Sequence, residues 1–221
     1  MSRPVRITIL VACGVLIAAA AVLAAIYTAS RHVPAFYREA LNDDPPARKK
    51  AAEHMLRQAT TLQNDLKREG TWQTVFTAAD LNGWLAVELP RNASPTLPPG
   101  FHDPRVRIDP TGISVACQVD RGGLHGVVSL DFDVYMEKPA VVGLRIRRVR
   151  VGAIPWSQDR VLKAISDAAQ QAELQIQWRQ AEGDPVALVS LPPTSHRGRT
   201  VRIDNVQIED GAIRISGATV R

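Results

Sequence analysis

Residues 128–136 carry the sequence VSLDFDVYM, and this stretch decides the fold. Apolar side chains occupy every second position from Val128 to Met136, and mostly polar side chains fill the positions between them. Successive side chains of a β-strand point to opposite faces, so the stretch predicts a strand with one apolar and one polar face. Residues 101–121 and 141–151 show the same alternation on either side. The pattern predicts an antiparallel sheet whose apolar face must be covered.

In the strand expected at residues 141–151, the apolar positions change parity between Ile146 and Val149. A period-two pattern can shift in this way within one strand only if an extra residue is inserted. We therefore expect a β-bulge near Arg147 and Arg148, which would also bend the sheet.

Two amphipathic helices are expected to cover the sheet. The first follows Thr77-Ala78-Ala79-Asp80, a variant of the capping box, and ends before Pro90. The second begins at Pro155-Trp156-Ser157 and has an apolar face from Val161 to Ala172. The sequence thus predicts an α+β domain over residues 72–221, in which a curved antiparallel sheet of about seven or eight strands is wrapped around two amphipathic helices.

The N-terminal segment from Ile7 to Tyr27 contains no charged residue. A helix of that length is roughly 30 Å long and matches the hydrocarbon core of a bilayer. A cleaved signal peptide is the alternative, but its apolar part is shorter, at about 7–15 residues. We predict a retained single-pass anchor in the plasma (inner) membrane, with residues 1–30 as cytoplasmic tail and transmembrane helix. Arg3 and Arg6 favour a cytoplasmic N-terminus, which places the C-terminal domain outside the cytoplasm.

Residues 31–71 are expected to form a membrane-proximal segment and a helix over Ala47–Glu69, which contains neither Gly nor Pro. Its apolar stripe, with Met55, Leu62 and Leu66, is narrow. The helix is therefore either a stalk or lies lightly on the domain, and we expect a stalk.

Catalytic and metal-binding patterns are missing from the sequence. The five histidines lack the spacing of a zinc or iron site, and there is no nucleophile elbow, phosphate-binding loop or dinucleotide glycine motif. The net charge of +5 is too small to indicate nucleic-acid binding. We therefore expect neither an enzyme nor a cofactor, metal or nucleic-acid partner.

Two charged groups allow alternative interpretations. Asp131 and Asp133 share the polar face of one strand, where we expect cross-strand ion pairs with Arg145 and Arg147 rather than acid–base catalysis. The cluster Arg145, Arg147 and Arg148 is either a solvated edge or a contact for phosphates of lipid headgroups.

The apolar sheet face is long relative to the two helices available to cover it, so we expect an open groove that binds a membrane lipid or another apolar ligand. Its expected lining is Val128, Leu130, Phe132, Val134, Val142, Leu144 and Ile146 from the sheet, with Leu162 and Ile165 from the second helix. The same residues could instead fill a dry core. The alternative function is a non-catalytic scaffold or partner-binding subunit of a cell-envelope complex, which would bind an envelope protein.

Three short motifs resemble known envelope proteins. Residues 76–85, FTAADLNGWL, and the passage RVGAIP at 150–155 are similar to the YpmS-like family, whose ectodomain follows a single N-terminal span. Residues 206–215, VQIEDGAIRI, resemble the final hairpin of LmeA-like lipid-binding proteins. Together the motifs extend over most of residues 72–217. The resemblance implies a tubular-lipid-binding (TULIP-like) module, in which a long curved sheet surrounds a helix and leaves a groove for acyl chains, without catalytic residues.

Overall fold

The computed structural model describes residues 31–91, 97, 99–121, 124–171, 174–191, 194–196 and 199–221. The transmembrane helix predicted within residues 1–30 lies outside these ranges. In the part of the chain that is described, no helix combines the length and apolar character needed to cross a bilayer.

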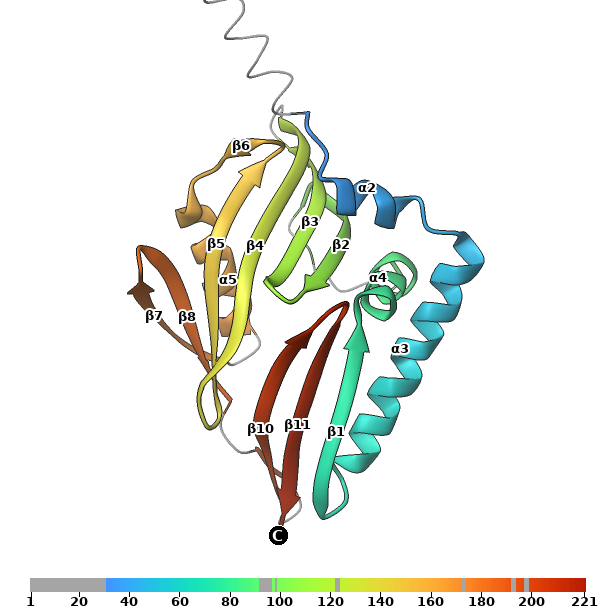
Figure 1. Ribbon diagram of the computed structural model, residues 1–221, viewed down its shortest axis with the longest axis vertical. Coiled ribbons are helices and arrows are strands. Elements are labelled where there is room, and N and C mark those ends of the chain that lie inside the picture. The colour runs from blue at the N-terminus through green and yellow to red at the C-terminus, as the bar shows by residue number, and fades with distance from the viewer. Residues whose placement is uncertain are drawn as a thin grey trace, which may run out of the picture.

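The described chain has an α+β fold with two antiparallel sheets, which confirms the α+β part of the predicted fold (Figure 1). The larger sheet has seven strands. In spatial order these are β2 (Phe101–Asp109), β3 (Gly112–Arg121), β4 (Leu124–Lys138), β5 (Val141–Val151), β8 (Asp184–Ser190) and β7 (Gln175–Ala181), with β6 (Ile154–Pro155) paired to β5.

The prediction of one sheet of seven or eight strands was wrong, because the last strands form a separate sheet. Its spatial order is β1 (Gly70–Thr77), β11 (Ala212–Val220), β10 (Arg199–Glu209) and β9 (Thr194–His196). The C-terminal hairpin pairs with β1, which precedes all strands of the larger sheet. Alternation along a strand defines its two faces but not the strand with which it pairs.

One face of the seven-stranded sheet is apolar across its strands, and we call it the inner face. Phe132 of β4 lies opposite Ile113 of β3 and Ile146 of β5, and Leu130 lies opposite Val115 and Val149. Val128 of β4 likewise lies between Cys117 of β3 and Val151 of β5. The apolar residues expected to share one face therefore do so.

The predicted β-bulge is confirmed. Asp131 of β4 pairs with Arg148, whereas the next residue, Phe132, pairs with Ile146. Arg147 is thus the extra residue in β5, and the bulge keeps Ile146 and Val149 on the same apolar face.

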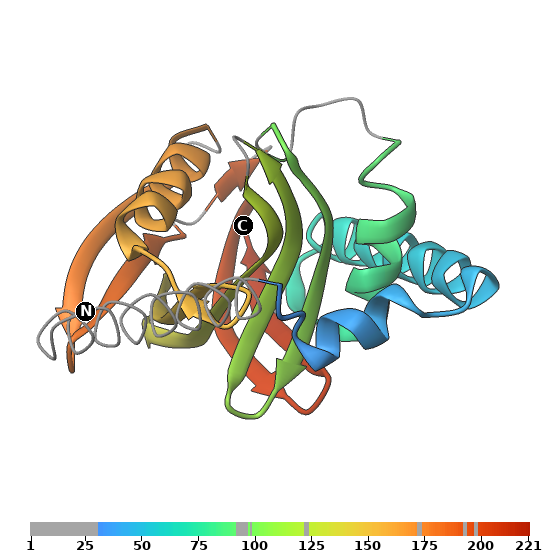
Figure 2. The ribbon, with the colours of Figure 1, turned by 90° about the horizontal axis from the view of Figure 1, so that it is seen from above.

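Helices lie on both faces of the larger sheet. On the inner face, α4 (Ala78–Val87) packs against β2, and α5 (Gln158–Gln171) packs near β5 and β7. On the opposite, outer face lies α2 (Ala35–Leu41), whose buried Tyr37 packs against Ala116 and Val127. Figure 2 shows α5 beside β7 and β8 at one side of the molecule, and α2, α3 and α4 at the other. The seven-residue helix α2 was not predicted.

Helix α3 (Pro45–Asp65) packs on the domain along α4 and β1, and it does not project as the expected stalk. Its contact with α4 is made by small residues. A Cβ atom added to Gly83 of α4 would lie 2.6 Å from the backbone nitrogen of Ala52, which is itself buried. A contact of this kind leaves no wide apolar stripe in the sequence, because it depends on the close approach of two backbones.

Candidate functional site

A pocket of about 520 Å³ lies between α4 and the inner face of the seven-stranded sheet. Every residue that lines it is apolar. The lining residues are Met55 of α3, Leu81, Trp84 and Leu85 of α4, Leu89 and Leu97 beyond α4, Pro104 and Val106 of β2, Ile113 and Val115 of β3, and Phe132 of β4.

Helix α4 is held above the pocket by the buried side chain of Asn82. Its amide nitrogen donates a hydrogen bond of 2.8 Å to the carbonyl oxygen of Val106, and its amide oxygen accepts one of 2.7 Å from the backbone N–H of the same residue. Val106 belongs to β2, one of the two edge strands of the sheet, and within the described ranges no further strand pairs with its outward N–H and C=O groups. Asn82 thus bonds the outward N–H and C=O groups of Val106 and fixes the distance between α4 and the sheet.

The start of α4 is fixed by the predicted capping box, which the structure confirms. The Thr77 hydroxyl accepts a hydrogen bond from the backbone N–H of Asp80, and the Asp80 carboxylate accepts from the Thr77 backbone. The other oxygen of this nearly buried carboxylate lies 2.8 Å from Nδ1 of His54 on α3. Met55, the residue next to His54 on α3, lines the pocket. The contact between His54 and Asp80 therefore also positions the part of α3 that forms the pocket wall.

The lining favours an apolar group, because none of its side chains carries a charge and the indole of Trp84 is its one side-chain hydrogen-bond donor. Water that enters this open pocket finds few hydrogen-bond partners along its apolar wall. The volume lies within the range of roughly 300–1,000 Å³ that is typical of small-molecule sites. Its chemistry therefore fits a hydrocarbon chain or another apolar moiety.

Of the residues expected to line a groove, Phe132 lines this pocket. Val128, Val142 and Ile146 are buried in the core. The remaining ones are half-buried: Leu130, Val134 and Leu144 on the inner face, and Leu162 and Ile165 on α5. The contribution of α4 was not predicted, although Leu81, Trp84 and Leu85 at helical spacing are an apolar signal for it.

The aspartates and arginines of the outer face form ion pairs. As expected, Asp133 pairs across the strands with Arg147 at 2.6 Å, whereas Asp131 pairs with Arg148 at 3.3 Å. Arg145 instead contacts Glu182 and Asp184 of the β7–β8 hairpin, and these hydrogen bonds, that of Glu182 first, raise the pKa of its guanidinium. A contact of these arginines with lipid headgroups stays a prediction, and each of them already has a carboxylate partner.

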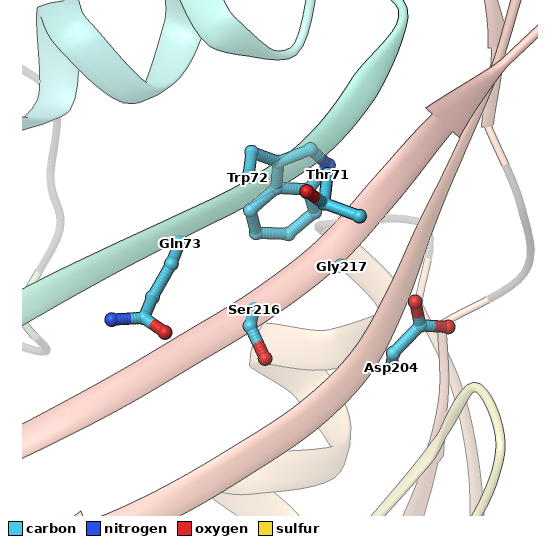
Figure 3. A pocket seen from close by; sticks show the side chains of 6 residues that line it. All are labelled: Thr71, Trp72, Gln73, Asp204, Ser216 and Gly217. Atoms are coloured by element: carbon cyan, nitrogen blue, oxygen red, sulfur yellow. The ribbon is translucent and has the colours of Figure 1, made fainter.

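A second pocket, of about 310 Å³, lies on the four-stranded sheet (Figure 3). Thr71, Gln73, Ser216 and Asp204 provide its polar groups, and Asp204 is ion-paired with Arg202. The indole of Trp72 packs against Gly217, where an added Cβ would lie 2.5 Å from the ring. The side chains of Thr71, Gln73, Ser216 and Asp204 are exposed or only half-buried, and the one carboxylate is paired. The buried indole nitrogen of Trp72 has no hydrogen-bond partner, but it is the one buried polar side-chain atom of this lining, so this pocket is a weaker candidate than the apolar one.

A cluster of exposed histidines and aspartates lies at one end of β2–β4. Asp120 accepts hydrogen bonds from His125 and His102, which lower the pKa of its carboxyl. Hydrogen bonds with Asp103 and Asp120, that with Asp103 being the larger cause, raise the pKa of His102. Among the described residues, no group of three or more His, Cys, Asp or Glu side chains is arranged to hold a metal ion.

No protein-family model, curated protein or solved structure matches the chain. Among the sites described above, the geometry favours the apolar pocket beneath α4.

Proposed function

We propose that the protein binds a lipid, or another apolar ligand, in the pocket between α4 and the seven-stranded sheet. The observation that carries this proposal is the lining of the pocket, which is apolar throughout and surrounds an open space of about 520 Å³. Side chains around such a space lack packing partners, so an apolar guest gains dispersion contacts and buries its own surface.

The position of the pocket supports the ligand class. It opens between elements that are held apart by Asn82 and the capping box, so the space is part of the folded arrangement. The half-buried Leu130, Val134 and Leu144 extend the same apolar face beyond the pocket. This combination is compatible with the TULIP-like arrangement implied by the resemblance of the sequence, which we retain as part of the proposal.

The membrane is the proposed source of the ligand. In this hypothesis the uncharged segment from Ile7 to Tyr27 anchors the chain in the plasma membrane, and the domain lies outside the cytoplasm. A membrane-tethered domain meets lipids at high effective concentration, which favours occupation of even a weak apolar site.

A fluorescent fatty-acid probe tests the proposal directly. We expect the purified full-length protein to bind the probe, and Leu85→Trp, which adds bulk to the pocket wall, to weaken binding at least tenfold. Leu56→Trp is the matched control, since Leu56 lies on α3 with 43% of its surface exposed and does not line the pocket. Thermal unfolding would verify that both variants are folded.

Absence of probe binding by the wild-type protein would contradict the proposal, as would equal binding by the two variants. A non-catalytic scaffold or partner-binding subunit would then be the better hypothesis. Crosslinking through α3 that recovers one stoichiometric envelope protein would favour it.

A further inference from the structure

The N-terminal end of the described chain is fixed to the outer face of the seven-stranded sheet by α2. The buried hydroxyl of Tyr37 donates a 2.8 Å hydrogen bond to the carbonyl oxygen of Asp103. The guanidinium of Arg105, which is 2% exposed, donates to the carbonyl oxygens of Ala40 and Pro104. These contacts prevent α2 from swinging independently of the sheet.

The contacts of Val33 and α2 show which end of the seven-stranded sheet holds the N-terminal end of the described chain. Val33 packs against the cluster of Tyr37, Ala116 and Val127. The carbonyl oxygen of Val127 accepts a hydrogen bond from Gly152, so the turn after β5 lies at the same end. In Figure 1 this is the upper end of the sheet, where β6 and the beginning of β4 are seen.

Only residues 28–32 separate the apolar segment ending at Tyr27 from Val33. Because an extended chain covers at most about 3.5 Å per residue, the distance from Tyr27 to Val33 is at most about 20 Å. A membrane anchor at Ile7–Tyr27 would therefore keep this end of the sheet close to the bilayer surface.

The surface at this end suits a lipid interface. Ala153 and Pro155 are exposed, and the apolar side chains of Phe101, Ile154 and Trp156 are half-buried. Aromatic side chains are favoured at the level of lipid headgroups. The nearby carboxylate of Asp120 has its two oxygens bonded by His125 and His102, which limits its repulsion from anionic lipids.

We infer that this end of the sheet, formed by Phe101 and residues 153–156, rests on the lipid bilayer. The inference rests on the proposed membrane anchorage and deepens it by assigning the surface that faces the lipid. Arg145 and Arg147 lie on β5 away from this end of the sheet. In this orientation the lipid headgroups meet Phe101 and residues 153–156, and not the arginines that the sequence suggested.

The orientation also connects the bilayer with the pocket. On the inner face of β3, Val119, Cys117 and Val115 follow one another from this end toward the pocket, which Val115 lines. Val119 and Cys117 belong to an apolar cluster with Phe101 and Trp156. An apolar row therefore leads from the proposed lipid-facing end to the proposed binding site.

Quenching in proteoliposomes tests the orientation with the full-length chain. In a background with Cys13→Ser and Cys117→Ser, a fluorophore is attached at Ala153→Cys or, as matched control, at Pro139→Cys. Both positions are exposed in turns, but residue 139 lies between β4 and β5 at the opposite end of the strands. The vesicles contain phosphatidylcholine and phosphatidylglycerol, with a nitroxide on a fraction of the headgroups.

We expect the label at residue 153 to be quenched at least threefold more strongly than the label at residue 139. Equal quenching, or stronger quenching at residue 139, would overturn the inferred orientation. Failure of the protein to float with the vesicles would overturn both the anchorage and the orientation. Strong quenching at residue 153 together with absent fatty-acid binding would support the orientation and contradict only the pocket.

Discussion

Helices α4 and α5 both cover the inner face of the seven-stranded sheet, but they are attached by different forces. Helix α4 buries the polar residues Asp80 and Asn82, and both make hydrogen bonds beyond their own helix. Helix α5 is strongly amphipathic and places Leu162 and Ile165 half-buried over the sheet. The difference shows how a pocket can persist, because directional hydrogen bonds fix a helix at a set height whereas apolar contacts favour the closest packing.

The largest effect is expected at Asn82. Asn82→Ala removes both hydrogen bonds to Val106 and leaves a buried N–H and C=O unpaired, which should lower the free energy of unfolding by about 3 kcal/mol. Urea denaturation measures the change. The control Gln73→Ala, which removes an exposed amide, should stay within about 0.5 kcal/mol of the wild type. A similar stability of the two variants would show that α4 is not held by its hydrogen bonds.

A somewhat smaller effect is expected at the contact between α3 and α4. In Gly83→Ala the new methyl group would meet the backbone atoms N of Ala52 and O of Arg48 at 2.6 and 2.7 Å. Because backbone cannot rotate away, we expect a loss of about 2 kcal/mol, and a larger loss for Gly83→Val. The same denaturation series measures both. Unchanged stability would mean that α3 does not rest on α4.

Helix α5 should be far less sensitive to the loss of its hydrogen bond. The Ser166 hydroxyl accepts from the indole N–H of Trp178, which is 36% exposed and can bond to water instead. Ser166→Ala should therefore change the free energy of unfolding by at most about 0.5 kcal/mol. A loss comparable to that of Asn82→Ala would remove the proposed distinction between the two helices.

Exposed electrostatic contacts should contribute least, as the cluster around Asp120 can show. The pKa of the Asp120 carboxyl lies below its ordinary value of 3.8. The ionised carboxylate therefore stabilises the folded protein fully above pH 3.8, and this contribution is lost as the pH falls through the lower folded-state pKa. The pKa of the His102 imidazole lies above its ordinary value of 6.5. The protonated imidazole therefore stabilises the folded protein fully below pH 6.5, and this contribution is lost as the pH rises through the higher folded-state pKa.

Asp120→Asn should accordingly lower the melting temperature slightly, with the largest difference between about pH 3.8 and pH 6.5. Melting curves of both proteins over acidic and neutral pH measure this difference, which should shrink at higher pH as His102 loses its proton. A difference that grows with rising pH would contradict the assigned contacts.

The features predicted correctly from the sequence depend on residues close together in the chain. The strands around residues 128–136, the bulge at Arg147 and the capping box at Thr77 all follow from local period and spacing. The pocket was not located, because it depends on how α4, α3 and β2 meet in space. Asn82 illustrates the reason, since its partner Val106 lies 24 residues away and no pattern links the two.

The pairing of β1 with β11 has a consequence for the order in which the chain is assembled. Residues 70–77 leave the ribosome long before residues 212–220, which supply their hydrogen-bonding partner. Contacts between such distant segments form slowly because a long loop must close. The larger sheet, built mainly from neighbouring hairpins, can form during synthesis, while the smaller sheet is completed only when the last strand has been made.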